Sequence, residues 1–66
     1  MDKIDAIVDK AIQYTEDILT RAPQHYKVAR QGLERMRDNL RMGAGDHPAL
    51  RKLGDYLDEL GRRYSN

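Results

Sequence analysis

Hydrophobic positions recur every three or four residues along most of this chain, which is the spacing that places side chains on one face of an α-helix. In the first third of the sequence the recurring positions are Ile4, Ile7, Val8, Ala11, Ile12, Thr15, Ile18, Leu19 and Ala22. So many isoleucine side chains along one broad face are typical of a buried surface. The pattern therefore predicts a helix over residues 2–21 whose apolar face packs against the rest of the protein.

The run Ala22-Pro23-Gln24 interrupts this first helix. A proline inside a helix removes a backbone hydrogen bond and clashes with the preceding turn. The break predicts two separate helices, with the second beginning at about residue 23. The apolar spacing from Ile18 to Tyr26 is almost in phase across the break, so one kinked helix over residues 2–42 is the alternative.

Two further stretches each carry a narrow apolar seam, meaning a line of side chains spaced three and four apart. The seam of the second helix, predicted over 23–42, consists of Tyr26, Ala29, Leu33, Met36 and Leu40. The seam of the third helix, predicted over 47–64, consists of Leu50, Leu53, Leu57, Leu60 and Tyr64. Two seams of equal length on either side of a short connection should pack together. We therefore expect an all-α fold in a single domain, 1–66: a three-helix bundle, or a helical hairpin with a third helix.

The connection between the second and third helices carries strong helix-ending and helix-starting residues. Gly43 follows the end of the second seam, and we expect it to close that helix at positive φ. Asp46 offers a side-chain oxygen to the free N–H groups of a new helix, and Pro48 suits a first helical turn. Pro48 also disfavours helix at His47, so the third helix begins at either Asp46 or His47.

The size and composition of the chain limit how it can be stabilised. It has 66 residues and no Phe, Trp or Cys, so it lacks both large aromatic anchors and disulfide bonds. Chains this small rely on regular helix packing or on oligomerisation. Because the isoleucine-rich face of the first helix is broader than two helices would cover, we expect a homodimer with the first helix at the contact.

The absence of cysteine fits a reducing compartment. No apolar run approaches the roughly 18 residues that a bilayer span needs, and no signal-peptide pattern is present. We therefore expect a cytoplasmic protein without a membrane partner.

The charges are balanced overall but unevenly distributed along the chain. Residues 1–20 contain five acids and two lysines, a net charge of −3, whereas residues 21–45 contain six bases and two acids, a net charge of +4. A basic stripe on one side of the second helix comprises Lys27, Arg30, Arg37 and Arg41. An acidic flank on the first helix comprises Asp2, Asp5, Asp9 and Glu16. We favour electrostatic packing between the two, or a solvated stripe, while a surface that follows nucleic-acid phosphates is the other interpretation.

Residues suited to catalysis or metal binding are few and scattered. Nucleophilic catalysis needs an activated Ser, Cys, Thr or Lys beside an oriented base, and no such set is evident. His25 and His47 begin successive helices, so about 28 Å of helix at about 1.5 Å per residue separates them. We therefore predict no catalytic residues, no metal site and no cofactor, and a protein that is not an enzyme.

Glycines inside the predicted helices are the least ordinary feature of the sequence. Each costs up to about 1 kcal/mol relative to alanine. Gly54 and Gly61 are seven residues apart, beside Leu50 and Leu57 of the third seam. Glycine there would let another helix approach closely. We therefore predict that Leu50, Gly54, Leu57 and Gly61 form a partner contact, and that replacing both glycines with alanine weakens the fold or its assembly.

These observations favour a small non-enzymatic protein–protein interaction or regulatory module: an adaptor, inhibitor or assembly factor that acts through helix surfaces. The expected partner is another protein, itself, or both. The alternative is a nucleic-acid-associated protein that uses the basic stripe. A helix-turn-helix interpretation is disfavoured, because the third helix contains Asp55, Asp58 and Glu59, which would repel phosphates.

Overall fold

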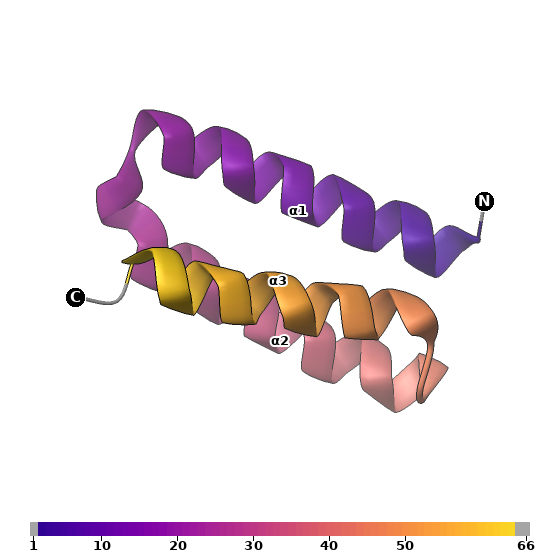
Figure 1. Cartoon of the computed structure of the whole chain (residues 1–66). Coiled ribbons are helices and arrows are strands. Elements are labelled where there is room, and N and C mark those ends of the chain that lie inside the picture. The colour runs from indigo at the N-terminus through magenta and orange to yellow at the C-terminus, as the bar shows by residue number, and fades with distance from the viewer. Residues whose placement is uncertain (1, 65–66) are drawn as a thin grey trace.

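The computed structural model describes residues 2–64 and folds them into three packed helices (Figure 1). The elements are α1 (Lys3–Arg21), the 3₁₀ turn η1 (Pro23–His25), α2 (Tyr26–Ala44) and α3 (Pro48–Tyr64). Helix α2 runs antiparallel to α1, and α3 returns parallel to α1 and lies beside α2. No strand occurs in the part of the chain described. The predicted all-α three-helix bundle is confirmed.

The break after α1 separates two helices rather than bending one. Ala22 has an extended φ of −144°, and its N–H donates to the Ile18 carbonyl oxygen at 2.7 Å. Pro23 then occupies the first position of η1, where its missing N–H is not needed. The alternative of one kinked helix over 2–42 is therefore wrong. At the other end of α1, Asp2 accepts a hydrogen bond from the Ile4 N–H at 3.0 Å and caps the helix.

The turn between α2 and α3 differs from the prediction at its glycines. Helix α2 continues through Gly43 and ends at Ala44. Gly45, with φ of 63°, is the residue at positive φ among those described. The expectation that Gly43 closes the helix is wrong because the helix extends beyond its seam, whose last member is Leu40. The Gly45 N–H donates to the Arg41 carbonyl oxygen at 2.9 Å and closes the last turn.

The start of α3 also departs from the prediction. The helix begins at Pro48, which confirms a proline in the first turn, but Asp46 makes no capping hydrogen bond within residues 2–64. His47 caps the helix instead, because its Nδ1 accepts the Ala49 N–H at 3.1 Å. An unprotonated ring nitrogen serves here as the acceptor that a carboxylate usually provides.

Helix α3 supplies most of the core. Its buried residues are Ala49, Leu50, Leu53, Tyr56, Leu57 and Leu60, whereas α1 buries Val8, Thr15 and Leu19 and α2 buries Leu33. The predicted seam of the third helix is thus buried almost along its whole length. The Thr15 hydroxyl donates to the Ala11 carbonyl oxygen at 2.8 Å, so this buried polar group is satisfied.

At one end of the bundle, the rings of Tyr26 and Tyr64 stack with centroids 4.9 Å apart.

None of the helices within residues 2–64 combines the length and the apolar character that crossing a membrane requires.

Candidate functional site

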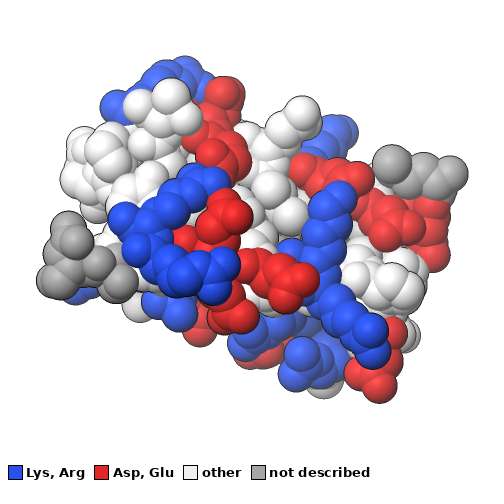
Figure 2. All heavy atoms as spheres, in the orientation of Figure 1, with Lys and Arg blue, Asp and Glu red and all other residues white. Residues whose placement is uncertain are grey.

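Charged pairs line the boundary between α1 and α3. The pairs are Asp2 with His47, Asp9 with Lys52, and Glu16 with Arg63. The three acids are seven residues apart, so they share one flank of α1. Figure 2 shows acidic and basic side chains interleaved on the face that presents α1 and α3. The expectation that this acidic flank packs against the basic stripe of the second helix is therefore wrong, since α3 lies against it.

Glu16 is the centre of the most extensive of these contacts. Its Oε1 accepts hydrogen bonds of 2.7 Å from the Tyr56 hydroxyl and from Arg63 Nη1. The Tyr56 hydrogen bond is the main reason that the pKa of Glu16 is lowered, and the Arg63 guanidinium adds to it. Burial, followed by the hydrogen bond to Glu16, raises the pKa of Tyr56. The network fixes α1 to α3 through charges that stay in place at neutral pH.

Asp2, Asp5 and His47 are the one group in the described chain whose ligand atoms lie close enough to share a metal ion, within 4.8 Å of one another. The hydrogen bonds around His47 oppose this use. Because Nδ1 accepts the Ala49 N–H, the neutral ring carries its proton on Nε2, which then donates to Asp2 Oδ2. A metal ion would need the lone pair of that same Nε2. The geometry therefore fits a helix cap tied to α1 better than a metal ligand.

Two members of the basic stripe on α2 lie at the boundary with α3. Arg37 and Arg41 border a hollow of about 300 Å³ that Asp55 and Asp58 of α3 also line. The Arg37 side chain is half-buried, and its Nε lies 3.5 Å from Asp38 Oδ1. Arg41 is exposed, but carboxylates of α3 line the same hollow as the two arginines, which weakens the phosphate-binding interpretation.

The other two members of the stripe differ from each other. Arg30 is half-buried; its Nη1 donates to the Tyr26 hydroxyl at 3.0 Å, and its Nε lies 3.5 Å from Glu34 Oε1. Lys27 is exposed and forms no ion pair within residues 2–64. The stripe is therefore split between half-buried and exposed cations.

The predicted partner contact on the third helix is largely covered by the chain itself. Leu50 and Leu57 are only 5% and 3% exposed. A Cβ added at Gly54 would meet nothing within 4 Å, and one added at Gly61 would meet only the Arg30 guanidinium, from 3.8 Å. The close helix approach that these glycines were expected to permit is not found within residues 2–64. A contact between them and a partner stays a prediction.

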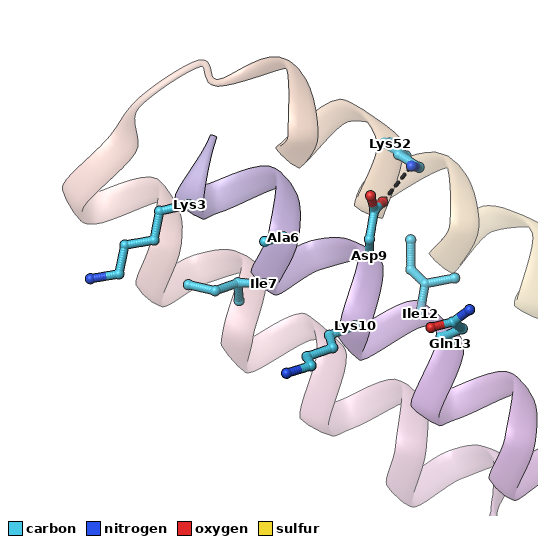
Figure 3. Close-up of a pocket in the computed structure, with 8 residues that line it drawn as sticks. All are labelled: Lys3, Ala6, Ile7, Asp9, Lys10, Ile12, Gln13 and Lys52. Carbon is cyan, nitrogen blue, oxygen red and sulfur yellow. Dashed lines mark hydrogen bonds and ion pairs between the residues drawn. The ribbon is translucent and has the colours of Figure 1, made fainter. Parts of the chain in front are cut away.

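A shallow hollow of about 660 Å³ lies on the outer side of α1. Figure 3 shows Lys3, Ile7 and Lys10 extending from one side of the helix, while Asp9 points to Lys52 of α3 on the other. The hollow thus combines an apolar side chain with two lysines that form no ion pair among the described residues.

A further hollow lies between α1 and α2, and we call it the α1–α2 groove. It measures about 230 Å³ and is lined by Ala11, Tyr14, Thr15, Ile18, Ala29, Gly32 and Leu33. Tyr14 at its edge is 69% exposed, and Val28, one helical turn before Gly32, is 71% exposed. No charged residue lines the groove, in contrast to the hollow between α2 and α3.

Sequence reasoning did not identify the α1–α2 groove, although a signal for it was present. Ile7, Ala11, Tyr14 and Ile18 repeat at steps of four, three and four, which forms a second apolar line beside the buried one.

Comparison with models of protein families, with curated proteins and with solved structures finds no match to this chain.

Proposed function

We propose that this protein is a small protein–protein interaction module that acts as an adaptor, inhibitor or assembly factor through its helix surfaces. The observation that carries the proposal is the exposure of Tyr14 at the edge of an apolar groove. Single exposed apolar residues are ordinary, but Tyr14 lines a concave apolar surface between two neighbouring helices, and the exposed Val28 lies one turn before Gly32 of that lining. A tyrosine beside such a groove is a residue type that dominates binding energy at protein interfaces.

A protein partner is favoured over a nucleic acid because of where the basic stripe lies. Arg37 and Arg41 border the same hollow as Asp55 and Asp58, so carboxylates line the surface that a phosphate would have to approach. Phosphate binding requires cations that are free to replace counterions. A homodimer that uses α1 stays a prediction, and it is one outcome of the test.

The proposal is tested with a photo-crosslinking phenylalanine derivative placed at position 14, and separately at position 58. Asp58 is exposed on α3, away from the groove, and serves as the matched control. Irradiation in an extract of the native cell should give covalent protein adducts from position 14 and few from position 58. An adduct of twice the 7.7 kDa chain mass would identify a second copy as the partner. Equal yields from both positions, or adducts from neither, would contradict an interaction through this groove.

A further inference from the structure

The three helix boundaries of the bundle are stabilised in different ways. Charged pairs flank the boundary of α1 with α3, and the hollow between α2 and α3 holds both arginines and aspartates. Between α1 and α2, no ion pair or side-chain hydrogen bond joins the helices within residues 2–64. This boundary carries the α1–α2 groove instead. We propose that the groove binds an amphipathic helix of a partner protein that carries acidic side chains beside its apolar stripe; this deepens the function proposed above and rests on it.

The groove of about 230 Å³ has room for side chains of a partner helix. Its sides come from two helices, with Tyr14 and Ile18 on α1 and Ala29 and Leu33 on α2. At Gly32 nothing lies within 4 Å of the position of an added Cβ, so a partner side chain has open space there. An amphipathic helix laid into an apolar groove between two helices buries its own stripe and completes a four-helix arrangement.

The charges beside the groove indicate an acidic partner. Lys10 lies one turn before Tyr14 on the same face of α1, Lys3 lies two turns further toward the start of that helix, and Arg35 lies three residues after Gly32 on α2. These three cations are exposed and form no ion pair in the described chain. Asp17 lies on the same face of α1, but Arg21 pairs with it at 3.0 Å and cancels its charge.

The same cations disfavour a second copy as the occupant. A second copy would bring its own Lys3, Lys10 and Arg35 towards the cations already present, and like charges at an interface are costly. A helix with glutamates on both sides of a leucine stripe offers the opposite charge at these positions. The partner class is therefore an acidic amphipathic helix rather than another molecule of this protein.

The test uses a designed fluorescent peptide of about 18 residues, which as a helix of about 27 Å matches α1 in length. One peptide has a leucine and alanine stripe flanked by glutamate, a second has lysine in place of glutamate, and a third scrambles the first. Fluorescence anisotropy with the full chain should show saturable binding of the glutamate peptide alone. Higher salt should weaken this binding because the flanking charges are exposed.

Two matched pairs of variants place the binding in the groove. Gly32→Leu should fill the open space and weaken binding by about tenfold, or about 1.4 kcal/mol, whereas Gly54→Leu on the other side of the bundle should not. Lys10→Glu with Arg35→Glu should weaken binding at least as much. Arg51→Glu with Arg62→Glu makes the same change in net charge at exposed residues of α3 and should have little effect. Circular dichroism confirms that each variant folds.

Several outcomes would overturn the inference. They are equal binding of the lysine peptide or the scrambled peptide, no loss in Gly32→Leu, or a doubled mass in sedimentation that involves this groove. If the glutamate peptide fails while position 14 still crosslinks to a protein in extract, the groove has a partner of other chemistry and the proposed function stands. If both experiments fail, the proposed function falls as well.

Discussion

His47 Nε2 lies 2.7 Å from Asp2 Oδ2, although 45 residues separate the two along the chain. The same ring accepts the Ala49 N–H through Nδ1, so one side chain both caps α3 and holds the start of α1 against it. The hydrogen bond between His47 and Asp2 is also the main reason that the pKa of Asp2 is lowered. We predict that His47→Ala lowers the free energy of unfolding by about 1 kcal/mol through loss of the cap, measured by urea denaturation.

His47→Asn is the matched control for this prediction. Asparagine is a strong N-cap, so the variant should recover most of the lost stability, but it lacks the ring nitrogen that bonds to Asp2. In both variants the pKa of Asp2, followed by carboxyl carbon NMR, should rise toward its ordinary value of 3.8. An unchanged Asp2 pKa in His47→Ala would show that the contact is not formed in solution.

Gly45 is the second position where a substitution should be costly. Its φ of 63° is a conformation that residues with a Cβ rarely adopt, and a strained residue of this kind costs about 1–3 kcal/mol. Gly45→Ala should therefore lower the melting temperature. Gly43 is helical and open, so Gly43→Ala should leave the melting temperature unchanged or raise it. The reverse order of the two variants would place the turn at Gly43.

Glu16 should make the protein sensitive to acid. Its folded-state pKa is lowered, so the stability it contributes is present above its ordinary pKa of 4.5 and is lost as the pH falls through the folded value. Because this side chain is 38% exposed, screening limits the effect, and we expect Glu16→Gln to cost about 1 kcal/mol at pH 7. Thermal unfolding at pH 7 and pH 3 should show the difference from wild type shrinking at the lower pH.

Asp58→Asn is the control for Glu16→Gln, because it removes an exposed carboxylate that forms no ion pair in residues 2–64. It should leave thermal unfolding at pH 7 and at pH 3 unchanged. Tyr56→Phe removes the hydrogen bond that lowers the Glu16 pKa most while keeping most of the packing, so it should also reduce the loss of stability on acidification. If Glu16→Gln matched wild type at both pH values, the hydrogen bonds and ion pair of Glu16 would not contribute to stability.

The helices were predictable because each one shows a local repeat of apolar residues in the sequence. The leucines of the third seam are spaced for burial, and the structure buries Leu50, Leu53, Leu57 and Leu60. Pro23 marks a true break because the geometry of its ring acts on the adjacent turn, whatever packs nearby. Such features need no knowledge of the distant part of the chain.

Contacts between helices were not predictable in the same way. The acidic flank of α1 is visible in the sequence, but whether α2 or α3 lies against it depends on the rotation of each helix about its axis. Net charge suggested α2, yet Glu16 pairs with Arg63 on α3, a helix whose charges nearly cancel. The cap of α3 was missed for a similar reason, because the hydrogen bond of His47 to Asp2 across the fold orients its ring.

For contacts within residues 2–64, Gly54 and Gly61 now predict a gain of stability on replacement by alanine, while a loss through a partner contact stays a prediction. A tightly packed helix at these positions would make alanine costly, since overpacking costs about 1–3 kcal/mol. The structure leaves Gly54 open and gives Gly61 only an ordinary contact with the flexible end of Arg30. Alanine then acts through its higher helix propensity and its smaller freedom in the unfolded chain. The double variant should be more stable by about 1–2 kcal/mol in urea denaturation.

The single variants show how much each of the two sites contributes to this expected gain. Gly54→Ala and Gly61→Ala should give similar shares, because the methyl group at position 61 meets Arg30 only at 3.8 Å, which is an ordinary van der Waals contact. A double variant that melts lower than wild type would mean that another surface packs on these glycines, since residues 2–64 place none there. Sedimentation of that variant against wild type would then show whether the lost surface belongs to a second copy.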